Sequence, residues 1–139
     1  MIVGFTGSRQ NPSKAQVPVL LARLQDPAHT IVEAHHGDCV GNDAFFHAAV
    51  KKCRPNASIV IHPPTEDAFR AHMDVTCELP PLPYLDRNHA IVEASDVLWA
   101  FPNSMSEVLR SGTWSTIRYA TRIRKPVWVV FPDGSQKEG

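Results

Sequence analysis

Apolar residues of this 139-residue chain gather in short continuous runs separated by longer stretches of mixed polarity. Runs that are apolar at nearly every position are typical of strands buried on both faces, as in parallel sheets. They predict five strands, at residues 1–6, 30–34, 58–62, 96–101 and 126–131. Trp99 and Trp128 fall within two of these runs, and we expect both in the core.

Apolar stripes at helical spacing lie between these runs. The expected helices cover about 17–24, 46–53, 86–94 and 111–122. Pro18 falls in the first turn of the first helix, where a proline is tolerated. Three prolines make 74–86 a predicted loop over one end of the sheet, and we expect the polar tail 133–139 to be frayed.

This alternation predicts an α/β fold, a Rossmann-like three-layer sandwich with a mostly parallel sheet of about five strands. We expect a single domain over residues 1–132. In such sheets ligands bind beyond the carboxyl ends of the strands. The loops that follow the strands are therefore the places where binding residues are expected.

Composition narrows the classes of function. Lys and Arg together number 14, as do Asp and Glu, so no net charge attracts nucleic acid or an anionic membrane. Three widely spaced cysteines without a C-x-x-C pair favour a reduced, cytoplasmic setting, and no apolar run approaches the ~18–20 residues of a membrane span. Seven histidines lack the spacing of a metal site, so we expect neither a metal nor a cofactor.

The loop after the first predicted strand reads Thr6-Gly7-Ser8-Arg9. Gly7 permits a positive φ and a close approach of the backbone, and the Ser8 hydroxyl can donate a hydrogen bond. The Arg9 guanidinium can hold a phosphate with two hydrogen bonds. An ordinary tight turn with a solvated arginine explains the same residues.

Two glycines bracket the loop between the second strand and its helix. Free N–H groups at a helix N-terminus form an anion site, which makes this loop a candidate for phosphate binding. The candidate residues are Gly37, Gly41, Asn42 and Asp43. Asp43 falls in the first helical turn, where a carboxylate either stabilises the helix end or accepts hydrogen bonds from ribose hydroxyls or a base.

The loop that opens the fourth helix carries more hydroxyl groups than a helix cap requires. One serine is enough for the cap, whereas free N–H groups and further hydroxyls suit a phosphate. The candidates are Ser111, Gly112, Thr113, Trp114, Ser115 and Thr116. Arg87 and Asn88, at the start of the third predicted helix, either reach the same crevice or serve as a solvated arginine and a helix-starting asparagine.

Four segments together resemble the SLOG superfamily, the Rossmann-like group that includes the Lonely Guy cytokinin-activating enzymes and the core of DNA-processing protein A. The segments are G-F-T-G-S-R at 4–9, G-D-C-V-G-N-D at 37–43, R-N at 87–88 and S-G-T-W-S-T at 111–116. The likeness covers nearly the whole chain and is strongest to small stand-alone members from bacteria and phages. It implies a nucleotide site between the glycine loops and the S-G-T helix, and a homodimer or higher homo-oligomer.

The enzymatic branch of this superfamily hydrolyses the N-glycosidic bond of nucleoside monophosphates and carries the signature P-G-G-x-G-T-x-x-E, which ends on the catalytic glutamate. Gly112 and Thr113 match its G-T, and Thr116 stands in place of the glutamate. A threonine cannot act as a base or stabilise an oxocarbenium-like centre as a carboxylate does. The resemblance thus implies a phosphate-binding site without the usual catalytic group. If catalysis occurs, Arg87 and Asp43 are the candidates, with Asp43 or Glu107 in place of the missing carboxylate.

Three functions stay open at this point. The first is binding of a nucleotide or of an NAD- or ADP-ribose-derived phosphorylated ligand, as a sensor or sequestering protein. This function requires the phosphate-binding residues but no catalytic carboxylate. The second is a nucleoside-monophosphate phosphoribohydrolase. The third is binding of single-stranded nucleic acid, against which the zero net charge argues.

Overall fold

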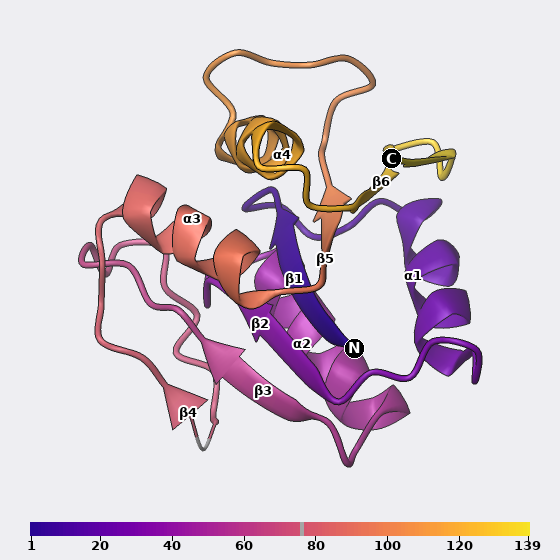
Figure 1. Ribbon diagram of the computed structural model, residues 1–139, viewed down its shortest axis with the longest axis horizontal. Helices are drawn as coiled ribbons and strands as arrows, with labels where there is room; N and C mark the ends of the chain where they lie inside the picture. The colour runs from indigo at the N-terminus through magenta and orange to yellow at the C-terminus, as the bar shows by residue number, and fades with distance from the viewer. Residues whose placement is uncertain (76) are drawn as a thin grey trace.

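The computed structural model describes residues 1–75 and 77–139 and shows a three-layer α/β sandwich (Figure 1). Its middle layer is a seven-stranded sheet in the order β4-β3-β2-β1-β5-β6-β7. Neighbouring strands are parallel except β6 and β7, which are antiparallel. The strands are β1 (Ile2–Gly7), β2 (Glu33–His36), β3 (Ser58–Ile61), β4 (Cys77–Glu78), β5 (Val97–Phe101), β6 (Val127–Val130) and β7 (Gln136–Glu138).

Four helices form the outer layers. They are α1 (Gln16–Gln25), α2 (Asn42–Cys53), α3 (Tyr84–Ala94) and α4 (Gly112–Arg122). α1 packs beside α2 on one face, and α3 packs beside α4 on the other, so that α3 crosses in front of the sheet in Figure 1 and α2 behind it. None of the described helices is long and apolar enough to cross a membrane. The predicted fold class is confirmed.

The order of the strands places a switch point at the middle of the sheet. From β1 the chain adds β2 and β3 on one side, and later adds β5 and β6 on the other side. The loops that leave the carboxyl ends of β1 and β5 therefore diverge over opposite faces and open a crevice between them, the usual ligand position in such sheets.

Apolar side chains fill both faces of the sheet. The α1–α2 side holds a cluster that includes Phe5, Phe46 and Trp99, with the Phe5 and Phe46 rings stacked at a centroid distance of 4.2 Å. The side of α3 and α4 holds a second cluster around Leu98 and Ala100. Trp99 and Trp128 are 0% and 1% exposed, which confirms the prediction that both belong to the core.

Several predicted boundaries differ from the structure. β2 covers Glu33–His36 and not the predicted 30–34. Its last two residues, His35 and His36, are polar and therefore lie outside the apolar run, but their rings are buried because they hydrogen-bond to other histidines. α3 begins at Tyr84, directly after Pro83. The predicted loop 74–86 contains the short strand β4, and Thr76 lies outside the described residues.

The expectation of a frayed tail is also wrong. Gln136–Glu138 forms β7 against β6, which raises the sheet from the five expected strands to seven together with β4. The indole N–H of Trp128 donates to Gln136 Oε1 at 3.0 Å, and Arg23 pairs with Glu138 at 2.7 Å. An edge strand can be this polar because only one of its sides pairs with the sheet.

Candidate functional site

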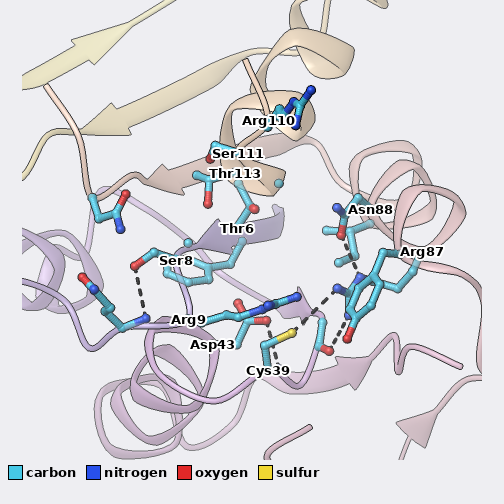
Figure 2. Close-up of a pocket in the computed structure, with 18 residues that line it drawn as sticks. Thr6, Ser8, Arg9, Cys39, Asp43, Arg87, Asn88, Arg110, Ser111 and Thr113 are labelled. Carbon is cyan, nitrogen blue, oxygen red and sulfur yellow. Dashed lines mark hydrogen bonds between the residues drawn. The ribbon is translucent and has the colours of Figure 1, made fainter. Parts of the chain in front are cut away.

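A cavity of about 590 Å³ lies where the β1 and β5 loops diverge (Figure 2). Its wall comes from segments far apart in the sequence, namely the loop after β1, the loop after β2, the first turns of α3 and the segment that opens α4. Eleven of the sixteen expected binding residues line it: Thr6, Gly7, Ser8, Arg9, Gly37, Asp43, Arg87, Asn88, Ser111, Gly112 and Thr113. Separate turns thus meet at one edge of the sheet.

Two of the expected residues shape the cavity without lining it. Gly41 has φ of 83°, and a Cβ there would lie 2.1 Å from the carbonyl oxygen of Arg9, so only glycine fits. Asn42 is buried, and its amide donates to Ser8 Oγ at 3.2 Å and to the Gln10 carbonyl at 3.0 Å. A Cβ on Gly7 would lie 2.5 Å from Cβ of Asn42. These contacts hold the β1 and β2 loops against each other.

The other three expected residues point elsewhere. The buried Trp114 side chain donates to Ser104 Oγ at 3.0 Å and lines a different groove. Thr116 is 2% exposed, and its hydroxyl donates to the Gly112 carbonyl at 2.8 Å, a bond within the helix. Ser115 is likewise outside the set that lines the cavity. Position 116, which matches the catalytic glutamate of the enzymatic branch, therefore does not face this cavity.

Cys39 and Arg110 lie in the candidate loops but are not among the expected binding residues, and the sequence analysis did not identify five further lining residues: Phe5, Gln10, Tyr84, Ile91 and Asn103. Arg110 had a usable signal, since it directly precedes the serine predicted to cap α4. Tyr84 had none, because the sequence pattern predicts the start of this helix two residues later, at 86. Asn103 follows β5 in a segment without a recognisable motif.

Arg87 is the central cation of the cavity floor. It is 5% exposed, and its guanidinium donates to the carbonyl oxygens of Gly37 at 2.6 Å and His62 at 3.2 Å. Its Nε donates to Asn88 Oδ1 at 2.7 Å. In the described chain it forms no ion pair with a carboxylate. A buried cation held mainly by carbonyl oxygens keeps most of its charge available to an anionic ligand.

Asp43 is the one acidic side chain among the described residues that line the cavity. It is 6% exposed, and its carboxylate accepts a hydrogen bond from the Cys39 N–H at 3.2 Å. Burial raises the pKa of Asp43 from 3.8 to about 6, although the Arg87 guanidinium and backbone N–H groups lower it. Asp43 lies in the first turn of α2, as predicted, but the N-cap is Gly41.

Arg9 lines the cavity and contacts two aromatic rings, of which Tyr84 also lines it. The exposed Arg9 guanidinium lies 3.9 Å over the Phe69 ring and 5.7 Å from the Tyr84 ring centroid. Figure 2 shows its side chain extending toward Arg87, beside Asp43 and Cys39. Burial raises the pKa of the Cys39 thiol, and the nearby Asp43 carboxylate raises it further. The thiol is therefore protonated at neutral pH.

The N-terminus of α4 forms the opposite side of the cavity. Ser111 is its N-cap, and its hydroxyl accepts from the Trp114 N–H at 3.2 Å, as predicted. The first N–H groups of a helix have no partner within the helix, so those of Gly112 and Thr113 remain for a ligand. A Cβ on Gly112 would meet no heavy atom within 4 Å, which shows open space there. Arg110, Ser111 and Thr113 lie together on this side in Figure 2.

Two pairs of histidines hydrogen-bond to each other near Arg87, which donates to the backbone carbonyl of one of them, His62. His36 Nε2 and His47 Nδ1 are 2.8 Å apart, and His35 Nδ1 and His62 Nε2 are 2.7 Å apart. Burial is the main cause that lowers the pKa of His36 to about 3 and that of His62 to about 4. Both rings are therefore neutral at physiological pH and act as hydrogen-bonding core residues. Within residues 1–75 and 77–139, no group of three or more His, Cys, Asp or Glu side chains is placed to hold a metal ion.

No protein-family model and no curated protein sequence matches the chain. Solved structures do match. The molybdenum cofactor binding protein of Rippkaea orientalis is 20% identical with a TM-score of 0.68, over 94% of this chain and 76% of that one. The structural-genomics target TM1055 is 18% identical with a TM-score of 0.64, over 91% and 71%. DNA processing protein A of Helicobacter pylori, studied for its single-stranded DNA binding, is 20% identical with a TM-score of 0.60, over 93% and 64%.

These likenesses define the class of protein, a Rossmann-like α/β fold with a cavity at the carboxyl ends of its parallel strands. At 18–20% identity they speak for the fold. DNA-processing protein A is one of the proteins that the four sequence segments resemble, and its solved structure matches most of this chain. The chain therefore has the Rossmann-like α/β fold that its sequence predicted, and it shares this fold with DNA-processing protein A.

Proposed function

We propose that this chain binds a phosphate-bearing nucleotide or nucleotide derivative in the cavity between β1 and β5. The observation that carries the proposal is the meeting of three arginines with the open N-terminus of α4 in one cavity. Arg9, Arg87 and Arg110 supply positive charge, and free N–H groups at a helix end supply directed donors. The cavity volume of about 590 Å³ falls in the range of about 300–1,000 Å³ usual for small-molecule sites.

In this proposal the phosphate binds to the N–H groups of Gly112 and Thr113, with Arg110 beside it. The sugar and base extend toward the floor, where the Asp43 carboxylate accepts hydrogen bonds from hydroxyl groups and the Arg87 guanidinium donates. The comparisons support a binding role, since proteins of this fold are described as binding a molybdenum cofactor and single-stranded DNA. The role of sensor or sequestering protein for an ADP-ribose-type molecule belongs to the same proposal.

Thermal unfolding with a panel of AMP, ADP-ribose and cyclic derivatives tests the proposal. A ligand at 100 times its Kd stabilises the fold by about 2.7 kcal/mol. We expect Arg110→Ala to weaken binding about tenfold or more without lowering the ligand-free Tm, because this side chain is exposed at the mouth. Arg124→Ala, at an exposed arginine two residues beyond the end of α4, is the matched control. No stabilisation by any member of the panel contradicts the proposal.

Asp43 favours one second candidate, a phosphoribohydrolase. Position 116 does not face the cavity, whereas the Asp43 carboxylate does and has a pKa of about 6. Hydrolysis of glycosidic bonds uses carboxyl groups as acid, base or nucleophile, and Asp43 is the one carboxyl side chain among the described residues that line the cavity. Release of free base from AMP, measured by chromatography and absent in Asp43→Asn, is the expected result of this candidate. Base release that persists in Asp43→Asn removes Asp43 from the mechanism.

Two expectations stay predictions. Binding of single-stranded nucleic acid predicts a gel shift at low salt that disappears steeply as salt rises. The expected homodimer or higher homo-oligomer is tested by sedimentation of the purified chain.

A further inference from the structure

A second groove, of about 510 Å³, lies away from the cavity, between α4 and the strands β6 and β7. α4 lies over β5, with β6 beside it in Figure 1. Strands in a sheet are about 4.8 Å apart and packed helices about 8–10 Å apart, so one helix covers about two strands. In the described chain, α4 is the last helix on this face, which leaves the outer part of the β6–β7 pair at the groove.

The groove has an apolar floor and wall. Alternate residues of β6 and the residue after it face the groove together with two residues of α4: Val127, Val129, Phe131, Trp114 and Ile117. On β7, Lys137 lies opposite Val129, and Gly139 exchanges backbone hydrogen bonds with Val127.

Side chains on both faces of β6 are buried, with Val127 at 7%, Val129 at 6% and Trp128 at 1% exposure, but a helix closes only the face of Trp128. Trp128 points to the opposite side of the sheet, where the Arg23 guanidinium of α1 lies 3.7 Å over its ring. α1 therefore closes the sheet over β6 on that side. On the side of α4, the corresponding space beside the helix is the groove.

The rim of the groove is cationic. Arg118, Arg122 and Lys137 line it, and Glu107 is the one acidic side chain among the described lining residues. Glu107 already pairs with Arg118 at 2.9 Å. Arg122 and Lys137 take part in none of the ion pairs of the described chain. An apolar groove bordered by two such cations is complementary to an apolar surface that carries carboxylates.

We propose that this groove binds an amphipathic helix of a partner protein, with acidic residues beside its apolar stripe. The stretch of α4 from Trp114 to Arg122 spans about 12 Å at 1.5 Å per residue, which matches the i, i+4, i+7 anchors of two helical turns. The acidic flank of the helix pairs with Arg122 and Lys137. A second copy of this chain fits less well, because a two-fold contact on this face brings one cationic rim close to the other.

A pair of synthetic peptides tests the proposal. Both are helical and about 15 residues long, with leucines at i, i+4 and i+7; one carries glutamates and the other carries lysines on the flanks. Fluorescence anisotropy measures their binding to the whole chain. We expect the glutamate peptide to bind, the lysine peptide not to bind, and the double variant Arg122→Glu/Lys137→Glu to reverse this preference, with about tenfold or greater loss for the glutamate peptide.

The matched control is Lys52→Glu, a charge reversal on an exposed residue of α2, which we expect to leave peptide binding unchanged. Unchanged Tm values show that the variants are folded. Equal binding of both peptides, binding of neither, or a preference that the double variant does not reverse overturns the proposal. So does a dimer of the wild-type chain in sedimentation that the double variant alters, because a second copy then occupies the groove.

Discussion

Replacing Asp43 by asparagine tests whether the buried, ionised carboxylate of Asp43 lowers the free energy of unfolding. The folded-state pKa of about 6 lies above the ordinary value of 3.8, so the folded chain binds this proton more tightly than the unfolded chain. The stability that the proton contributes is fully present below pH 3.8 and is lost as the pH rises through about 6. From these two values, ionising Asp43 at pH 8 costs the folded state up to about 3 kcal/mol.

The asparagine of the variant carries no charge and keeps an oxygen that can accept from the Cys39 N–H, so the substitution removes the cost without removing that hydrogen bond. We expect Asp43→Asn to be more stable than wild type by about 1–3 kcal/mol at pH 8, and the gain to disappear near pH 4. Urea unfolding of both proteins at several pH values between 4 and 8 measures this difference.

The control for this experiment is Glu66→Gln, which removes an exposed carboxylate. We expect it to change the free energy of unfolding by less than about 0.5 kcal/mol at every pH. A variant Asp43→Asn that is less stable than wild type at pH 8, or whose gain is the same at pH 4 and pH 8, refutes the reasoning. A stabilised variant that also loses ligand stabilisation would show that Asp43 is retained for binding and not for folding.

Three further predictions concern the elements that support the cavity. Gly41→Ala is expected to lower the free energy of unfolding in urea by at least about 2 kcal/mol, because Gly41 has a positive φ and an added Cβ would collide with the Arg9 carbonyl. Gly112→Ala is its control: the added Cβ meets open space, and we expect the free energy of unfolding to change by less than about 0.5 kcal/mol. Arg87→Met is expected to cost about 2–4 kcal/mol, since it leaves two buried carbonyl oxygens without their charged donor; an unchanged free energy of unfolding contradicts this. Wild-type stability is expected to fall as the pH drops below 6.5, because His36 and His62 are held neutral with pKa values of about 3 and 4, and their two contributions exceed the opposite one of Asp43. His62→Gln flattens that fall in urea melts at pH 7, 5 and 4.

The sequence pattern predicted most of the sheet because buried parallel strands are nearly continuous apolar runs. The pattern did not predict strand residues that are polar and buried through hydrogen bonds to one another. His35 and His36 extend β2 because their rings bond to other histidines, and no apolar period marks them. The β7 residues are polar, as is common in a strand at the edge of a sheet. A polar sequence of this kind is equally typical of a disordered tail, so the sequence alone could not distinguish the two.

The sequence predicted the position of the cavity, because the loops that follow parallel strands meet at one edge of the sheet. The roles of single residues within it depended on distances that no pattern contains. Gly41 serves the site through its contact with the backbone of Arg9 rather than by lining the cavity. Thr116 shares the motif of α4 but is buried, and its hydroxyl bonds to a carbonyl of its own helix. Arg110 lines the cavity from one residue before that motif.

The two helix N-termini near the cavity differ in a way that bears on the proposed ligand. At α2 the Asn42 N–H donates to the Ser8 carbonyl at 3.2 Å, and Asp43 places a carboxylate in the first turn. At α4 the N–H groups of Gly112 and Thr113 have no partner within the helix, and the acidic side chain of the described cavity lining, Asp43, belongs to α2. Two unit charges about 4 Å apart interact by about 4 kcal/mol at an effective dielectric constant of about 20. A second phosphate near an ionised Asp43 meets repulsion of this order, whereas a hydroxyl group there finds an acceptor. In the proposed binding mode this repulsion opposes a second phosphate beside Asp43, the Arg9 and Arg87 guanidinium groups offset it, and protonation of Asp43 near pH 6 removes it.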